Sequence, residues 1–151
     1  MTFEQAVDAV LKEEAGYAND PADKGGETIC GITRKNYPSW PGWVLVDAAQ
    51  PHPNELLNSP EFVGLVRDYY KVEWWDRYGL QLVDARIRGK LFSFAVNMGW
   101  PAANKLYMTS KDAPDPLMAL IHQACLRYAR ICQKDPTQVK WLAGWINRAF
   151  G

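Results

Sequence analysis

The sequence has few of the residues from which metal centres and disulfide frameworks are built. It contains three cysteines and two histidines, His52 and His122, and the cysteines form no close metal-binding pattern. Cys125 and Cys132 are seven residues apart, which places them two helical turns apart and too far for a direct bridge. We therefore expect three buried free thiols, no metal site and no cofactor.

The sequence also lacks an excess of charge of either sign and any long apolar run. Seventeen Lys and Arg balance seventeen Asp and Glu, which gives no electrostatic reason to expect binding to nucleic acid or to an anionic membrane. No stretch is apolar enough to span a bilayer, and the N-terminus, MTFEQAVDAV, has no basic segment typical of a signal peptide. We therefore expect synthesis in the cytoplasm and no stable membrane insertion.

The composition is that of an ordinary globular protein that is rich in aromatic residues. At 151 residues and 48% hydrophobic content, the chain is expected to form one compact domain with a buried core. Seven Trp and seven Tyr are many for a chain of this size. Some of these amphipathic rings are expected at a cleft, where they provide flat faces on which sugars stack.

Apolar spacing and end signals predict a mostly helical chain. Apolar residues at helical spacing indicate a first helix over residues 3–14. Ser59, Pro60 and Glu61 form an N-cap, a first-turn proline and a first-turn acid, which start a helix that runs to about Trp75. Further helices are expected over about 84–99, 116–133 and 136–151. Residues 15–33 are rich in turn-forming residues and predict a small irregular hairpin or an Ω-like loop, and the proline-rich residues 37–54 predict a second loop. The fold is therefore expected to be mostly helical, with five to seven helices.

Two adjacent glutamates end the first helix, and they differ in the direction they face. Counted at 100° per residue from Phe3, Glu14 lies at about 20°, inside the apolar stripe, whereas Glu13 lies about 80° to the other side. Burial and the negative end of the helix dipole both disfavour an ionised carboxylate, so Glu14 is suited to donate a proton. The alternative is that the helix has unwound by Glu14, which then faces solvent.

The run from Glu14 to Thr33, EAGYANDPADKGGETICGIT, closely resembles the signature of glycoside hydrolase family 108, roughly E-G-G-Y-x-x-D-P-x-D-x-G-G-x-T-x-x-G-I-T. Ala15 stands where the family usually has glycine. The segment FSFAVNMG, residues 92–99, is similar to the family's F-D-x-A-V-N-x-G, with Ser93 in place of the acid. The segment WLAGWINR, residues 141–148, is similar to its F-L-x-G-W-x-N-R close. The resemblance thus covers nearly the whole chain.

The family resemblance implies a lysozyme-like, mainly helical fold and N-acetylmuramidase activity on peptidoglycan. It implies that Glu14 is the catalytic acid, which agrees with the position of Glu14 on the helix. It gives a single domain, with a catalytic part over about 1–98 and a helical part over about 99–151 that is expected to form a small peptidoglycan-binding lobe. The expected partner is the peptidoglycan glycan strand, with no nucleic acid partner, and the chain is expected to be a monomer.

The second catalytic group is less well defined by the sequence. We rank Thr28 and Asp20 ahead of Asp23 and Glu27. The order of the acid Glu14, a loop aspartate and a threonine before a Gly-Ile turn resembles the arrangement in phage lysozymes. Each aspartate has a local alternative, because acids in such turns commonly bond their own backbone amides. No second carboxylate is adjacent enough to suggest a nucleophile, which favours inversion of configuration.

For substrate binding the sequence offers aromatic faces and an amide. The residues selected are Tyr17, Tyr70, Trp75 and Asn97, while Trp141 and Trp145, spaced i, i+4, are interpreted as structural. The alternative for Tyr70 and Trp75 is core packing.

The leading hypothesis is a phage endolysin that is made in the host cytoplasm and acts on the wall in the periplasm after a holin opens the inner membrane. A bacterial muramidase associated with secretion fits the same sequence. A wall-binding module without catalysis is a further alternative, and so is a helical adaptor that uses exposed Trp side chains for protein contacts.

Overall fold

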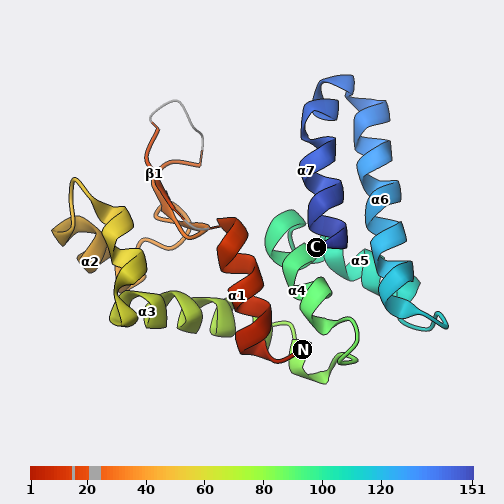
Figure 1. Cartoon of the computed structure of the whole chain (residues 1–151), viewed down its shortest axis with the longest axis horizontal. Coiled ribbons are helices and arrows are strands. Elements are labelled where there is room, and N and C mark those ends of the chain that lie inside the picture. The colour runs from red at the N-terminus through yellow and green to blue at the C-terminus, as the bar shows by residue number, and fades with distance from the viewer. Residues whose placement is uncertain (15, 21–24) are drawn as a thin grey trace. The chain divides into compact units, whose positions relative to one another are not determined.

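The structure is a computed structural model that describes residues 1–14, 16–20 and 25–151. Asp23, one of the candidate acids, therefore lies outside the described residues. The chain divides into two compact units (Figure 1). The N-terminal unit is Phe3–Gly79, and the C-terminal unit is Leu80–Gly151 together with Met1–Thr2. The boundary between the two units follows residue 79, and the division into a catalytic part and a peptidoglycan-binding part near residue 98 stays a prediction.

The N-terminal unit combines helices with one small sheet. Its elements are α1 (Phe3–Glu14), β1 (Tyr17–Ala18), β2 (Thr28–Ile29), β3 (Ile32–Thr33), α2 (Gly42–Ala48), the 3₁₀ helix η1 (Pro53–Asn58), α3 (Pro60–Tyr70) and the π-helical η2 (Lys71–Asp76). The strands pair antiparallel in the order β1-β2-β3. In register, Ala18 faces Thr28, which in turn faces Thr33. The hairpin expected over residues 15–33 is thus a three-stranded antiparallel sheet.

The C-terminal unit is entirely helical among the described residues. Its elements are the 3₁₀ helix η3 (Leu80–Leu82), α4 (Arg88–Met98), α5 (Trp100–Ser110), α6 (Pro116–Lys134), the 3₁₀ turn η4 (Pro136–Gln138) and α7 (Val139–Phe150). Asp115 caps α6, because its side chain accepts a hydrogen bond from the backbone N–H of Met118. Tyr128 on α6 stacks on Trp145 of α7, with ring centroids 5.3 Å apart.

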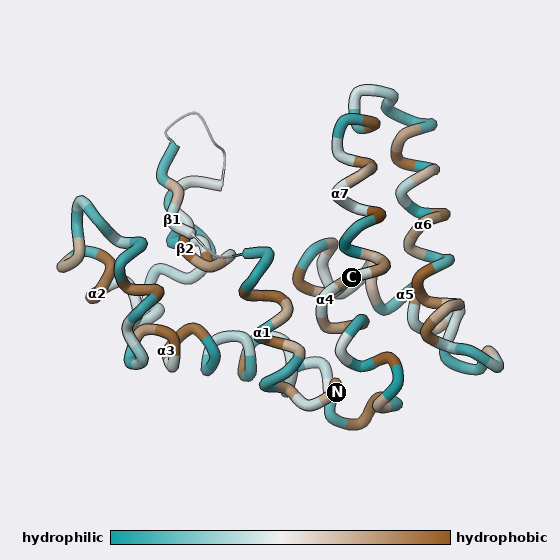
Figure 2. Tube along the Cα trace, in the orientation of Figure 1, coloured by the Kyte–Doolittle hydropathy of each residue, from teal (hydrophilic) through white to brown (hydrophobic). Residues whose placement is uncertain are grey.

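Each unit has its own buried side chains. Figure 2 shows hydrophobic residues recurring between hydrophilic ones along α1 and α6, as expected of helices with one buried face. In the N-terminal unit the fully buried side chains include Val7, Ile29, Ile32, Phe62 and Tyr70. In the C-terminal unit they include Ile87, Leu91, Phe92, Phe94 and Leu120. Among the described residues, no helix is long and apolar enough to cross a membrane.

The mainly helical fold class is confirmed, and among the described residues two α-helices are additional to those expected. α2 lies within the proline-rich tract that was expected to be a loop, and α5 follows Gly99 directly. The three cysteines are free thiols, as expected, but only Cys30 is buried, while Cys125 and Cys132 are half-buried. Trp141, interpreted from sequence as structural, is 54% exposed, in contrast to Trp145, which packs on Tyr128.

Candidate active site

The two glutamates at the end of α1 occupy different environments. α1 buries Ala6, Val7 and Val10 and remains helical through Glu14, so the helix does not unwind before this residue. Glu14 is half-buried, whereas Glu13 is exposed. This difference follows from the helical spacing, because Glu14 continues the buried stripe and Glu13 does not.

The turn between β2 and β3 lies against the Glu14 side chain. Both turn residues have positive φ, 50° at Cys30 and 75° at Gly31, which is the pattern of a two-residue type I′ hairpin. A Cβ at Gly31 would lie 3.4 Å from both Cβ and Oε2 of Glu14 and only 2.7 Å from the hydroxyl of Tyr70. Glycine is therefore needed at position 31 for its conformation and for the close approach of the turn to the carboxyl group.

Tyr70 holds this turn from within the core. Its hydroxyl donates a 2.8 Å hydrogen bond to the backbone carbonyl of Cys30, and the Tyr70 side chain is 1% exposed. Burial, followed by the nearby Glu14 carboxylate, raises the pKa of Tyr70 far above its usual value, so the phenol stays protonated as a donor. The turn, the phenol and the Glu14 carboxyl thus form one packed group.

The candidates for the second group lie on or beside the small sheet. Thr28 on β2 is half-buried, and its hydroxyl donates to the carbonyl of Gly26 at 3.3 Å. Asp20 is exposed and follows β1. The sequence did not single out Thr33, which faces Thr28 across the hairpin and whose buried hydroxyl has no hydrogen-bond partner among the described residues. The roles of Thr28 and Asp20 stay predictions.

Glu27 is bound in an ion-pair network that joins the hairpin to α2. Its carboxylate accepts a 2.9 Å hydrogen bond from the hydroxyl of Tyr17 and pairs with Arg34 at 2.5 Å. Arg34 also pairs with Asp47 and lies 4.5 Å over the ring of Trp43. Since Glu27 is already bound to a cation and a phenol, the network supports its lower rank as a catalytic group and gives it a structural role.

The predicted sugar-binding residues differ in their access to solvent. Tyr17 is half-buried, and its hydroxyl also accepts from Gln50 at 3.2 Å. Tyr70 and Trp75 are 1% and 4% exposed, so both rings are core residues, and their predicted sugar contacts are not carried into the proposal below. Asn97 is half-buried on α4 and belongs to the C-terminal unit, and its contact with substrate stays a prediction.

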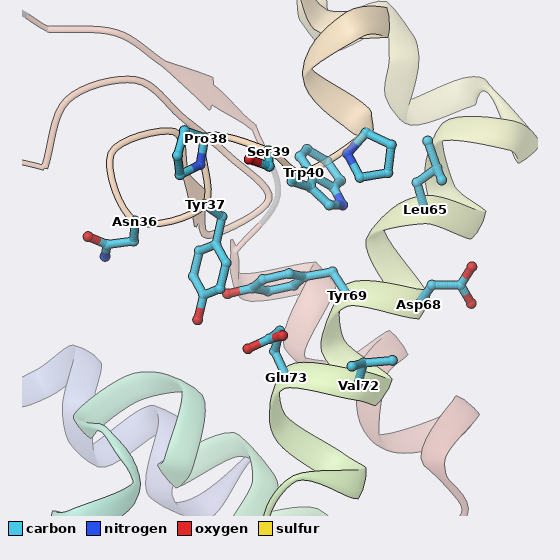
Figure 3. Close-up of a pocket in the computed structure, with 11 residues that line it drawn as sticks. Asn36, Tyr37, Pro38, Ser39, Trp40, Leu65, Asp68, Tyr69, Val72 and Glu73 are labelled. Atoms are coloured by element: carbon cyan, nitrogen blue, oxygen red, sulfur yellow. The ribbon is translucent and has the colours of Figure 1, made fainter.

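An aromatic pocket that the sequence did not reveal lies in the N-terminal unit. It has a volume of about 540 Å³ and is lined by rings of Tyr37, Trp40 and Tyr69, with the carboxylates of Asp68 and Glu73 at its edge (Figure 3). The ring of Tyr69 packs edge-on against Tyr37 at 4.8 Å. One sequence signal could have indicated this pocket. Tyr37 and Trp40 are each followed by a proline in a segment expected to be a loop, and loops on a rigid scaffold often carry binding residues.

Comparison with known proteins identifies the family. The sequence model of glycosyl hydrolase 108 matches residues 7–99, which is more than half of the chain and includes most of α1 and the three strands of the small sheet. The chain belongs to glycosyl hydrolase family 108. It is therefore a glycoside hydrolase, as the resemblance of its N-terminal signature predicted. Neither the curated proteins nor the solved structures contain a match.

The family match covers the two units to different extents. It covers nearly the whole N-terminal unit and ends at Gly99, so α5, α6 and α7 lie outside it. The similarity noted at residues 141–148 is thus beyond the matched region. The Glu14–Thr33 run, which resembles the family signature, lies within the match and contains Glu14 and Gly31 of the packed group, while Tyr70 lies outside the run but within the match.

Proposed function

We propose that this family 108 glycosidase is an N-acetylmuramidase that hydrolyses the β-1,4 bond between N-acetylmuramic acid and N-acetylglucosamine in peptidoglycan. The observation that carries the proposal is the position of Glu14, half-buried at the end of α1 and packed against the Gly31 turn within the family signature. A carboxyl group that is partly shielded and held by a rigid turn is a suitable proton donor for a leaving sugar oxygen.

In the proposed reaction, Glu14 protonates the glycosidic oxygen as the bond breaks and an oxocarbenium-like state develops. A water molecule, positioned by Thr28, then adds to the opposite face of the sugar and inverts its configuration, while the carboxylate of Asp20 accepts the proton that the water loses. Inverting enzymes keep their two carboxyl groups about 6.5–9.5 Å apart to admit this water, while retaining enzymes have them at about 5–5.5 Å. The assignment of Asp20 thus requires the wider separation.

For substrate binding we propose the aromatic pocket of the N-terminal unit. The pocket is connected to the catalytic group by one ring contact: Tyr69, which lines the pocket, packs 5.2 Å from Tyr70, the buried phenol that lies near Glu14. Trp40 and Tyr69 are 9% and 8% exposed, so the half-buried ring of Tyr37 offers the main face for a sugar. The carboxylates of Asp68 and Glu73 can accept hydrogen bonds from sugar hydroxyls. Tyr17 and Asn97 remain proposed binding residues.

The biological setting that we propose is that of an endolysin, made in the host cytoplasm and reaching the periplasmic side of the wall once a holin has opened the inner membrane. The same chemistry serves a bacterial muramidase that remodels the wall for secretion. A peptidoglycan-binding module without catalysis is the alternative from another class, and it predicts binding to walls with no release of fragments.

The test compares two neighbouring carboxyl groups. Glu14→Gln should lower the rate of clearing of purified cell walls by about 10²–10⁴-fold, as expected for loss of a general acid, with an unchanged melting temperature. Glu13→Gln is the matched control, because it makes the same change at an exposed position one residue away, and it should retain the parent's rate. Equal clearing by both variants would remove Glu14 from the mechanism.

The products identify the bond and the reaction. Mass analysis of the digested muropeptides should find reducing muramic acid ends with one water added per cleavage. Reducing glucosamine ends would reassign the enzyme to the other glycosidic bond of the strand, and anhydro ends would make it a transglycosylase. Following the anomeric configuration of the first product distinguishes inversion from retention.

A further inference from the structure

The balanced charge of the whole chain conceals two units of opposite charge. The C-terminal unit contains ten Lys and Arg but only four Asp and no Glu, for a net charge of +6. The N-terminal unit contains seven Lys and Arg and thirteen Asp and Glu, for a net charge of −6. The balanced total charge gave no electrostatic reason to expect an anionic partner. The net charge of the C-terminal unit does give such a reason.

The four carboxylates of the C-terminal unit are all bound by neighbouring groups. Two form ion pairs and two accept hydrogen bonds from the backbone at the start of a helix. The contacts are Asp84 with Arg86 at 2.6 Å, Asp112 with Lys111 at 2.7 Å, Asp115 with the N–H of Met118 at 3.0 Å, and Asp135 with the N–H of Thr137 at 3.1 Å. None of these contacts neutralises a cation of α5 or α6.

Four of the remaining cations line one groove between α5 and α6. The groove has a volume of about 320 Å³, and its charged lining residues are Lys105, Arg127, Arg130 and Lys134. Its other lining residues are aliphatic, Thr or Gln, so no carboxylate faces these cations across the groove. In the fully described residues 80–151, none of the four forms an ion pair.

Three of these cations follow one line along α6. Arg127, Arg130 and Lys134 are spaced three and four residues apart, which places them on one helix face over a length of about 10 Å. Like charges at this spacing repel each other and reduce helix stability. An anionic ligand lying along the groove removes this repulsion, so the arrangement is suited to a linear polyanion.

The lining also indicates what kind of polyanion is bound. No aromatic residue lines the groove, so it offers no ring on which a base or the face of a sugar could stack. Recognition must come from the cations, and the planar guanidinium groups of Arg127 and Arg130 match the geometry of phosphate oxygens. A groove between two helices accepts a single chain more readily than a flat bilayer surface.

We propose that the α5–α6 groove binds a linear polyol-phosphate polymer of the cell envelope and retains the enzyme near its wall substrate. The choice of an envelope polymer rests on the proposed function, which brings the enzyme to the wall. From the sequence, residues 99–151 are expected to form a lobe that binds the peptidoglycan glycan strand. The polymer proposed here is a different ligand, because the groove binds its phosphates by charge and has no aromatic ring on which a sugar could stack.

The test measures binding of the full chain to poly(glycerol phosphate) by isothermal titration calorimetry over a range of salt concentrations. Affinity should fall steeply as salt rises, because binding releases counterions. Arg127→Gln with Arg130→Gln should weaken binding about tenfold or more and reduce the salt slope by roughly 1 to 2. Arg86→Gln with Lys140→Gln removes the same charge outside the groove and should bind as the parent does.

A second pair of substitutions, Lys105→Gln with Lys134→Gln, keeps the test valid if the arginine variant fails to fold, because both lysines are exposed. The alternative probes are a thymidine oligonucleotide, vesicles of phosphatidylcholine and phosphatidylglycerol, and peptidoglycan stripped of phosphate polymers. Tighter binding to any of these than to poly(glycerol phosphate) overturns the proposal in favour of that partner. If the groove variants and the control variant weaken polymer binding equally, the effect is one of net charge, and this result also overturns the proposal.

Hydrolysis of the phosphate-free walls, measured on the same variants, separates this inference from the proposed function. The groove variants should keep the parent's rate on these walls, since none of the changed residues belongs to the active site. Polymer binding by a chain that releases no fragments would contradict the muramidase assignment alone. Hydrolysis with no polymer binding would contradict the groove assignment alone.

Discussion

Substituting Gly31 by alanine is expected to destabilise the N-terminal unit and to impair catalysis together. At a φ of 75°, a residue with a Cβ costs about 1–2 kcal/mol relative to glycine. The new methyl group would also lie 2.7 Å from the Tyr70 hydroxyl, which is buried and has little room to move. Displacing that hydroxyl loses its hydrogen bond to the Cys30 carbonyl, at a further cost of about 1–3 kcal/mol.

Together these costs give a loss of about 2–5 kcal/mol, which for a chain of this length lowers the melting temperature by roughly 5–15 °C. Thermal unfolding followed by circular dichroism measures this shift. Gly64→Ala is the matched control, because Gly64 lies within α3 and the methyl group of an alanine there would have no neighbouring atom within 4 Å. That substitution should raise stability by about 0.5–1 kcal/mol.

The double variant Gly31→Ala with Tyr70→Phe tests the cause. Removing the hydroxyl relieves the contact, so the double variant should lose less stability than the sum of the single variants, by about 1 kcal/mol or more. The methyl group also approaches Cβ and Oε2 of Glu14, so activity per folded molecule should fall in Gly31→Ala. If Gly31→Ala melted like the parent, or if the two substitutions were additive, the proposed packing of turn, phenol and carboxyl would be refuted.

Two further predictions concern the C-terminal unit. Asp115→Ala removes the cap of α6 at the Met118 N–H and should lower the free energy of unfolding by about 1 kcal/mol, measured by thermal unfolding. Asp112→Ala, in the exposed loop before α6, is the control and should lower it by less. Equal losses of stability in the two variants would contradict the capping role. The Arg86 side chain holds the pKa of Asp84 at about 2, below the value of about 4 in the unfolded chain. The pair therefore stabilises the fold above pH 4, and this contribution is lost as the pH falls through 2. Asp84→Asn should therefore lower the melting temperature near neutral pH and have a much smaller effect at pH 2, where about half of the Asp84 carboxyl groups are protonated. An equal difference at both pH values would contradict the assignment.

Most helices that were predicted correctly have a side-chain cap or a clear apolar stripe, and α4, which no side chain caps, is the exception. Ser59 caps α3 as the sequence indicated, and Asp115 caps α6. α2 was missed because it is short, follows Pro41 and has no side-chain cap. α5 was missed because the expected helix ended at Gly99 and the segment after it was not assigned, although Pro101 lies in the first turn, where a proline commonly starts a helix.

The candidate site was predictable in part. Helical spacing placed Glu14 on the buried face, because an α-helix has a fixed period. The environment of the carboxyl was not predictable, since Gly31 and Tyr70 reach it from segments 17 and 56 residues further along the chain. Tyr70 and Trp75 were selected for sugar binding because an aromatic residue looks the same in sequence whether it lines a groove or a core.

The turn at Cys30 also limits how this protein can be engineered. Position 30 combines a left-handed backbone with a side chain that is only 3% exposed. Asn-Gly is the preferred pair for such turns, yet asparagine here would bring an amide into the interior without assured partners. A consensus exchange that strengthens hairpins in other proteins should therefore weaken this one, and alanine, which keeps the interior apolar, is the safer replacement for an oxidisable thiol.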